Sequence, residues 1–229
     1  MPFYDRLVGE TRDDLRQTIT TPELEAALNG NISIQAYVEY LTRTYHYVRS
    51  MIPLMRLAEH RLEHRPVLAD ALRAYIQEEA GHEQRVLEEI EAVGGDPSIA
   101  VGSTPSGTTQ AMIDHAGDMV RDRNATSIFG EIFAIDTISA AIADKAIHAM
   151  ITGAGCSDDF FPDLCLDVQA HHRERSLVDL LNQIDDPDDQ RAIVTMAHDM
   201  YRLFGAIFTD LPIGEFDSKP ALKEDRLCS

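Results

Sequence analysis

The stretch Pro66–Gly94 reads PVLADALRAYIQEEAGHEQRVLEEIEAVG and has no proline after its first residue. Its apolar residues recur at steps of three and four, the spacing of one face of an α-helix. They are Leu68, Leu72, Tyr75, Val86, Ile90 and Val93. Glu79 and His82 fall on the same face. A carboxylate and an imidazole in an apolar stripe are costly unless they are hydrogen-bonded, paired or bound to a metal. The stretch therefore predicts one long helix with a polar pair turned inward.

The same kind of interruption occurs in two later segments. In the strongly apolar segment Ser127–Met150, Glu131 is the one acid on the apolar stripe. In a third, amphipathic segment, Asp167 and His171 lie four residues apart on the apolar face, and Glu174 continues the row one turn later. Three predicted helices thus each direct an acid or an imidazole toward the core.

Carboxylates combined with two histidines suit a non-haem iron or manganese site. In helical bundles, such sites are built from the facing sides of several helices. Each group also has a plainer interpretation. Glu79 and His82 could form a buried hydrogen-bonded pair, Glu131 could be an acid at a helix N-terminus, and Asp167 with His171 could be an exposed ion pair.

Composition narrows the class of protein. The chain has 229 residues, 44% of them hydrophobic, which is enough for one substantial core. Its net charge of −19 argues against binding to nucleic acid or to anionic membranes. Three cysteines in no paired motif fit a reducing compartment. The N-terminus has no signal pattern and we find no apolar run of bilayer length, so we expect a cytoplasmic protein.

Helical periodicity dominates the chain, and strand signals are nearly absent. We predict an all-α domain over residues 1–209, followed by an extended or disordered tail over residues 210–229. The predicted helices are Asp5–Thr18, Pro22–Leu28, Ser33–His64, Pro66–Val93, Gln110–Arg123, Ala125–Ile151, Asp158–Ile184 and Pro187–Thr209. Gly94–Thr109 is rich in Gly, Ser, Thr and Pro and is predicted to be a loop.

Two stretches resemble the first two core helices of haem-oxygenase-like proteins. One is Glu78-Glu79-Ala80-Gly81-His82-Glu83, followed by Gly94-Gly95-Asp96-Pro97. The other is Leu28-x-Gly30-x-Ile32-Ser33, continued by Tyr37-x-x-Tyr40-Leu41 and Tyr45-His46. The resemblance extends over about residues 21–181, and it implies a bundle of seven to eight helices.

Within that superfamily, the sequence is similar to the di-iron oxidases. These carry a Glu-x-x-His pair, a lone Glu on a later helix and a row of acid and histidine on a third. The resemblance implies two iron ions per chain, or manganese, and the implied ligands are Glu79, His82, Glu131, Asp167, His171 and Glu174. It also implies O2-dependent oxidation of a small organic acid or amino acid, a catalytic role for Glu131, and a homodimer.

The sequence departs from several relatives at defined points. Some carry a histidine at both ends of the last row, where this chain has Asp167 and Glu174, which leaves the sixth ligand open. No histidine precedes Ser33, where haem oxygenases hold haem. The alternatives are a cofactor-free, thiamin-type or pyrroloquinoline-quinone-type enzyme on the same fold, a non-catalytic binding or regulatory protein, and a ferritin-type metal store, which normally shows a second Glu-x-x-His.

Other polar clusters are interpreted as structural or solvated. Glu59, His60, Glu63 and His64 crowd a helix end without an apolar surround. Asp144 and His148 form a pair on a different face from Glu131. Further candidates are Arg43, Arg49 and Lys145 for binding a substrate carboxylate, Phe129, Phe133, Phe160 and Phe161 for lining an apolar pocket, and Tyr45 as a tyrosine close to the metal site.

Overall fold

The computed structural model describes residues 1–153, 170–209 and 211, with the side chains of residues 143–144, 146–153 and 170–175 left out of that description. Within these residues the chain is helical and contains no strand. The helices are α1 (Phe3–Ile19), α2 (Pro22–Leu28), α3 (Ile34–Arg61), α4 (Pro66–Glu79), α5 (His82–Ala92), α6 (Pro97–Gly102), α7 (Gly107–Asp118), α8 (Ile128–Gly153), α9 (Ala170–Leu181) and α10 (Pro187–Ala206). A π-helical turn (Met119–Arg123) and a 3-10 turn (Ala125–Ser127) join α7 to α8.

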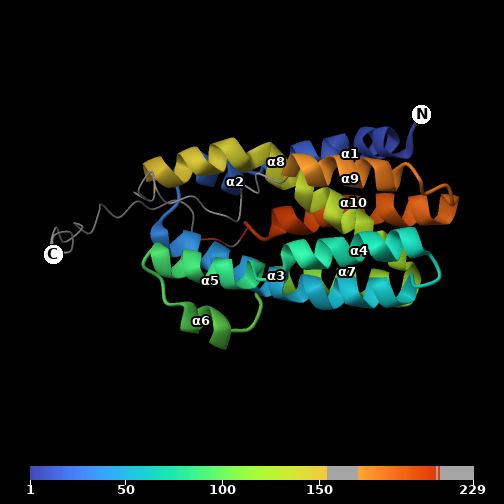
Figure 1. The fold of residues 1–229 in the computed structure, drawn as a ribbon. Helices are drawn as coiled ribbons and strands as arrows, with labels where there is room; N and C mark the ends of the chain where they lie inside the picture. The colour runs from blue at the N-terminus through green and yellow to red at the C-terminus, as the bar shows by residue number, and fades with distance from the viewer. Residues whose placement is uncertain (154–169, 210, 212–229) are drawn as a thin grey trace.

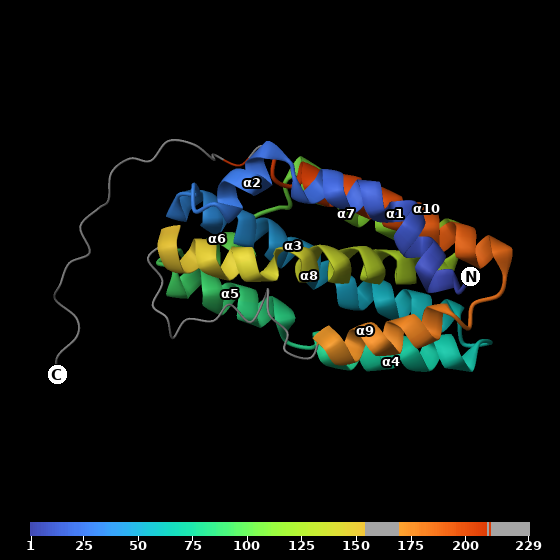
Figure 2. The same ribbon diagram turned by 90° about the horizontal axis from the view of Figure 1, so that it is seen from above.

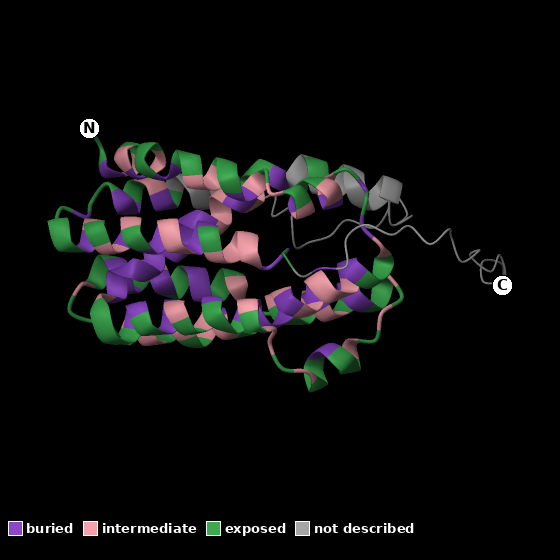
Figure 3. Ribbon diagram, turned by 180° about the vertical axis from the view of Figure 1, so that it is seen from behind, coloured by how far each residue is buried: buried purple, intermediate pink, exposed green. Residues whose placement is uncertain are grey.

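The helices form an elongated bundle around α8 (Figure 1). Seen from above, α8 runs along the middle, with α1 and α10 on one side and α4 and α9 on the other (Figure 2). Helix α3 packs against both α4 and α5, and α6 projects from the side next to α5. Buried positions lie where the helices face one another, and exposed positions cover the outer faces (Figure 3).

Local capping explains where several helices begin. The Ser33 side chain accepts a hydrogen bond from the Ala36 backbone N–H at the start of α3, as the sequence predicts. At the start of α10, the Asp186 side chain accepts from the backbone N–H of Asp188, and Pro187 occupies the first helical position. These caps satisfy N–H groups that have no partner inside the helix.

Helix α8 contributes many of the residues of the hydrophobic core. Its first half buries Ile128, Phe129, Ile132, Phe133 and Ile138 almost completely. Gly130 lets α8 approach α10 closely, because a Cβ there would lie 2.2 Å from the Ile193 carbonyl oxygen. The segment Ala125–Ile142 is long and apolar enough to cross a membrane, with a mean hydropathy of 1.4, contrary to the prediction that no such run exists. Since 67% of it is buried inside the bundle, we interpret it as a core helix.

The structure corrects two predicted elements. Residues 66–93 do not form one helix, because the chain breaks at Ala80–Gly81 and continues as α5. The predicted loop after Gly94 contains α6, capped by the Asp96 side chain, which accepts from the Ser98 backbone N–H. The helix Pro22–Leu28 has the predicted ends, and the other predicted helices are present with shifted ends. Residues 158–169 of the predicted helix Asp158–Ile184 lie outside the described residues, as does the tail apart from Leu211.

Candidate functional site

Glu79 and His82 lie on either side of the break between two helices. Glu79 is the last residue of α4, and His82 is the first residue of α5. His82 Nδ1 lies 2.7 Å from Glu79 Oε2, so the two side chains form a hydrogen-bonded pair. Their side chains are 19% and 16% exposed respectively, so the pair sits at the edge of the core and not deep inside it.

Gly81 makes this arrangement possible. Its φ of +84° lies in the left-handed region, which glycine adopts without a steric penalty. The break replaces the predicted continuous helix, yet it brings the two side chains together as the sequence spacing suggested. The prediction of one continuous helix is therefore wrong, and the hydrogen-bonded Glu79–His82 pair, which the sequence analysis gave as the alternative to metal ligation, is present.

Glu131 lies one turn into α8 and is 1% exposed. Its Oε1 accepts a hydrogen bond of 2.9 Å from the hydroxyl group of Tyr47, which is itself buried on α3. Glu131 is thus an acid in the first turn of α8, as the plainer interpretation had it, but its carboxylate is buried in the core.

Burial dominates the electrostatics around Glu131. It raises the pKa of Glu131 from 4.5 to about 7, although the hydrogen bond from Tyr47 opposes this change. Burial, followed by the charge and hydrogen bond of Glu131 and then by the charges of Glu79 and Asp136, raises the pKa of Tyr47 well above 10.0. Carboxylates from α4 and from two positions on α8 therefore act on one phenol group.

Two buried polar atoms at this place have no hydrogen-bond partner among the described residues. They are Nε2 of His82 and Oε2 of Glu131. An imidazole nitrogen and a carboxylate oxygen are ordinary ligand atoms for iron, manganese or zinc. The residues present on α4, α5 and α8 thus fit the metal that the sequence resemblance implies. The described side chains alone do not form a group of three or more potential ligands around one point.

The third predicted group belongs to the α9 region. Asp167 lies outside the described residues, and so do the side chains of His171 and Glu174. The backbone of α9 packs against both α4 and α8. Helices α4 and α9 run antiparallel, so that the beginning of α9 lies near the end of α4 (Figures 1 and 2). The helix that carries His171 and Glu174 is therefore a neighbour of the helices that carry Glu79 and Glu131.

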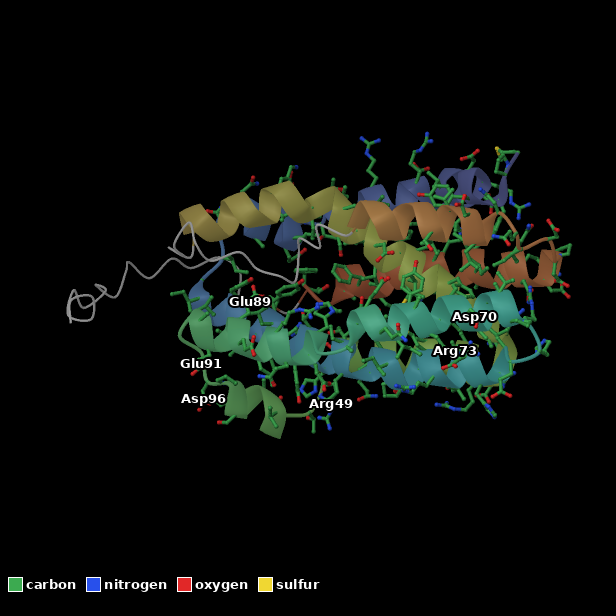
Figure 4. All side chains as sticks on the ribbon, in the orientation of Figure 1. Arg49, Asp70, Arg73, Glu89, Glu91 and Asp96 are labelled. Carbon is green, nitrogen blue, oxygen red and sulfur yellow. The ribbon has the colours of Figure 1, made fainter. Side chains whose placement is uncertain are left out.

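The cluster at the end of α3 is solvated, as predicted. His60 Nδ1 lies 2.8 Å from Glu63 Oε1, and these side chains are 76% and 65% exposed. Glu59 forms an ion pair with Arg73, which also binds Asp70 on the outer face of α4 (Figure 4). Side chains of the predicted pair Asp144 and His148 are outside the description, as are Phe160 and Phe161.

The candidate substrate-binding cations are not gathered at the site. Arg43 is buried, and its Nη1 donates to the Ile207 carbonyl oxygen at 2.6 Å while its Nε donates to Glu39. Arg49 and Lys145 are exposed, and Arg49 lies on the side of the bundle that carries α6 (Figure 4). Of the three candidates, Arg43 is therefore engaged elsewhere, because its guanidinium joins the C-terminal end of α10 to α3.

Sequence reasoning missed Tyr47 and Asp136. It singled out Tyr45, which packs against His46 with ring centroids 5.3 Å apart. Tyr47 lies on the row of buried α3 residues that continues through Met51 and Met55, four residues apart each time. That spacing was present in the sequence and marks Tyr47 as a buried residue, but Tyr45 is buried as well, so the spacing does not show which tyrosine meets Glu131. Of the predicted aromatic residues, Phe129 and Phe133 are buried as expected.

No protein-family model and no curated protein sequence matches this chain. Solved structures do match it over nearly their whole length. A domain of unknown function with a heme oxygenase-like fold from Shewanella denitrificans is 18% identical, with a TM-score of 0.79 and 91% of each chain covered. A TenA homologue from P. horikoshii is 10% identical, with a TM-score of 0.75 over 91% of this chain and 97% of that one.

Heme oxygenase-1 from the cyanobacterium Synechocystis is 13% identical, with a TM-score of 0.65 and 93% of each chain covered. Taken together, these likenesses show that the protein has the all-α haem-oxygenase-like fold, as the sequence predicts. At such low identity they show the fold alone.

Proposed function

We propose that this protein is a non-haem di-iron oxidase that uses O2 to oxidise a small organic acid or amino acid. The observation that carries the proposal is the pair of buried ligand atoms, His82 Nε2 on α5 and Glu131 Oε2 on α8, which have no hydrogen-bond partner among the described residues. Glu79, His82 and Glu131 would hold the metal together with Asp167, His171 and Glu174 from the α9 region. Manganese could occupy the same set of ligands.

The Glu79–His82 contact prepares the histidine for metal binding. When His82 Nδ1 donates its proton to Glu79 Oε2, the lone pair of Nε2 is left available. A carboxylate that accepts from the second nitrogen of a ligating histidine fixes the orientation of the ring and increases its basicity. The contact thus selects the tautomer that a metal site requires.

Glu131 is the proposed catalytic residue. With its pKa near 7, its carboxyl group is partly protonated at neutral pH, and a bound cation would displace that proton. Glu131 is 1% exposed, and Phe129 and Phe133 on the same helix are also buried, so its carboxyl group lies in a core from which water is excluded. Iron bound here would supply the electrons for the reduction of O2.

The proposal is tested by metal analysis of protein expressed with added iron. We expect up to two metal ions per chain in the wild type and a sharp loss in His82→Ala and His171→Ala. His198→Ala is the matched control, because His198 pairs with Asp14 at 2.8 Å on a different part of the bundle. Full metal content in both His82→Ala and His171→Ala would refute the ligand assignment. Loaded protein should also melt at a higher temperature than metal-free protein.

The activity is tested by O2 consumption of the ferrous protein with a panel of amino acids and fatty acids. We expect consumption above that of metal-free protein, and faster consumption with the correct substrate. If metal binds but no O2 is consumed and no substrate disappears, the protein would be a metal-binding or regulatory protein.

The second candidate is a cofactor-free, thiamin-type or pyrroloquinoline-quinone-type enzyme. It is favoured by the structural likeness to a TenA homologue with a TM-score of 0.75. In that case His82 and Glu131 would act on an organic substrate directly. Wild-type protein that binds no metal, yet converts thiamin or a related compound after treatment with a chelator, would establish this alternative.

A further inference from the structure

We infer that Tyr47 positions Glu131 for the metal, holding Oε1 through its hydroxyl group so that Oε2 is presented to the ligand site. This inference rests on the proposed function, because it assigns a role to a residue that would not itself bind the metal. It adds α3 to the helices that build the site. Tyr47 and Glu131 are 84 residues apart in the sequence, so only the fold brings them together.

The geometry supports this role. Tyr47 is 6% exposed, and its hydroxyl lies 2.9 Å from Glu131 Oε1. A glutamate side chain has several rotatable bonds, and a single hydrogen bond to one oxygen limits the directions in which the other can point. That other oxygen, Oε2, is buried and has no hydrogen-bond partner among the described residues. Tyr47 thus holds one half of the carboxylate and leaves the other half for a ligand.

The chemical nature of the phenol suits a positioning role. The charges of Glu131, Glu79 and Asp136 all act on the hydroxyl, and together with burial they favour its protonated form. A protonated phenol can donate one hydrogen bond, and here it donates to Glu131. Hydrogen-bond partners of metal-ligating carboxylates typically change metal affinity 10–100-fold when they are removed.

Tyr45 provides a matched control. It lies two residues away on the same helix and is buried to the same degree, at 5% exposure. Its ring packs against His46, and it belongs to the separate core formed with Val86 and Ile90. Replacing either tyrosine by phenylalanine removes one buried hydroxyl group from α3, but only Tyr47→Phe removes the hydrogen bond to Glu131.

The test is a titration of metal-free protein with Mn²⁺, followed by loss of the electron paramagnetic resonance signal of the free aqueous ion. We expect Tyr47→Phe to raise the Kd roughly 10–100-fold, and Tyr45→Phe to change it less than about twofold. The spectrum of bound Mn²⁺ should also change in Tyr47→Phe, because Glu131 would contact the metal differently. Thermal melting of the metal-free variants records the purely structural effect.

The outcomes separate the two proposals. If wild-type protein and Tyr45→Phe bind Mn²⁺ and Tyr47→Phe binds it equally well with the same spectrum, the role of Tyr47 is refuted and the metal site stands. This holds even if Tyr47→Phe melts at a lower temperature, which would mark the hydrogen bond as structural only. If the wild type binds neither Mn²⁺ nor Fe²⁺, the proposed function fails and the role of Tyr47 fails with it.

Discussion

Two buried carboxylates, Asp189 and Glu131, show how differently one fold can treat the same chemical group. They lie on α10 and α8, which pack against each other, and they are 7% and 1% exposed. Asp189 uses both oxygens: Arg65 binds Oδ2, while Asn124 and Thr126 donate to Oδ1 at 2.8 Å and 3.2 Å. Among the residues that the structure describes, Glu131 has a single hydrogen bond, from Tyr47.

The electrostatic results differ accordingly. Burial alone would raise the pKa of Asp189, but the hydrogen bonds from Asn124, Arg65 and Thr126 and the charge of Arg65 together lower it. For Glu131, burial outweighs its one hydrogen bond and raises the pKa to about 7. A fully satisfied carboxylate joins the ends of helices, whereas a half-satisfied one retains the capacity to bind a ligand, at a cost to stability.

The largest expected effect on stability comes from removing Asp189, the carboxylate whose two oxygens both accept hydrogen bonds. Asp189→Ala leaves Arg65, Asn124 and Thr126 without their acceptor, and we expect it to lower the free energy of unfolding by about 3 kcal/mol. Urea denaturation measures this change. Asp188→Ala is the control, since Asp188 is 76% exposed and pairs with exposed Arg191, and it should cost less than about 0.5 kcal/mol. Equal losses in the two variants would contradict the structural role of Asp189.

The next effect is the pH dependence of the stability of the metal-free protein. A folded-state pKa raised from 4.5 to about 7 means that Glu131 releases its proton more readily in the unfolded chain, so stability falls as the pH rises through that interval. The Glu131→Gln variant does not lose stability in this way, because glutamine does not ionise. We expect the variant to match the wild type near pH 5 and to exceed it by roughly 2 to 3 kcal/mol at pH 8.

Urea denaturation at several pH values measures this difference directly. The contribution of Asp189 to stability depends on pH in the opposite direction. Because its pKa is lowered in the folded protein, this contribution is present above pH 3.8 and is lost as the pH falls. A stability difference between wild type and Glu131→Gln that stays constant from pH 5 to pH 8 would show that Glu131 is ionised at no cost in the folded protein.

A smaller effect tests the part of the site that lies at a helix break. Gly81→Ala places a side chain at φ +84°, and we expect a loss of about 1 kcal/mol together with weaker metal binding. Gly9→Ala is the control: Gly9 lies within α1, and, as at Gly81, nothing lies within 4 Å of an added Cβ. It should stabilise the protein by about 0.5 to 1 kcal/mol. Thermal melting distinguishes the two signs, and a stabilising Gly81→Ala would refute the role of the break.

Sequence periodicity was sufficient for the fold class, and it drew attention to Glu79 and His82, although their hydrogen-bonded pair was only the alternative interpretation. The apolar spacing identified the core helices, and Ser33 marked the start of α3 through its cap. The break at Gly81 was missed because one left-handed residue hardly disturbs a three- and four-residue pattern. Whether Asp167, His171 and Glu174 complete the site remains a prediction from the sequence.

Long-range contacts were beyond the reach of the sequence. Tyr47 meets Glu131 because α3 and α8 both belong to the same core, and nothing local to residues 45–47 specifies which tyrosine does so. The partner of Arg43 could not be predicted for the same reason, since it is a backbone carbonyl group far along the chain. Local patterns predict which face of a helix is buried, but the partner of a buried polar group depends on the packing of distant segments.

The smallest expected effect concerns the histidines that resemble a metal site in sequence only. The double variant His60→Ala/His64→Ala removes two exposed imidazoles at the end of α3, and the His60–Glu63 contact joins side chains that are 76% and 65% exposed. Water competes with any ion at such a place, and exposed pairs contribute little to stability. We expect wild-type metal content by elemental analysis and a change in unfolding free energy within about 0.5 kcal/mol. If this variant lost its metal while His82→Ala kept the wild-type metal content, the metal site would lie at the end of α3. Glu131 would then have no ligand-binding role to distinguish it from the structural carboxylate of Asp189.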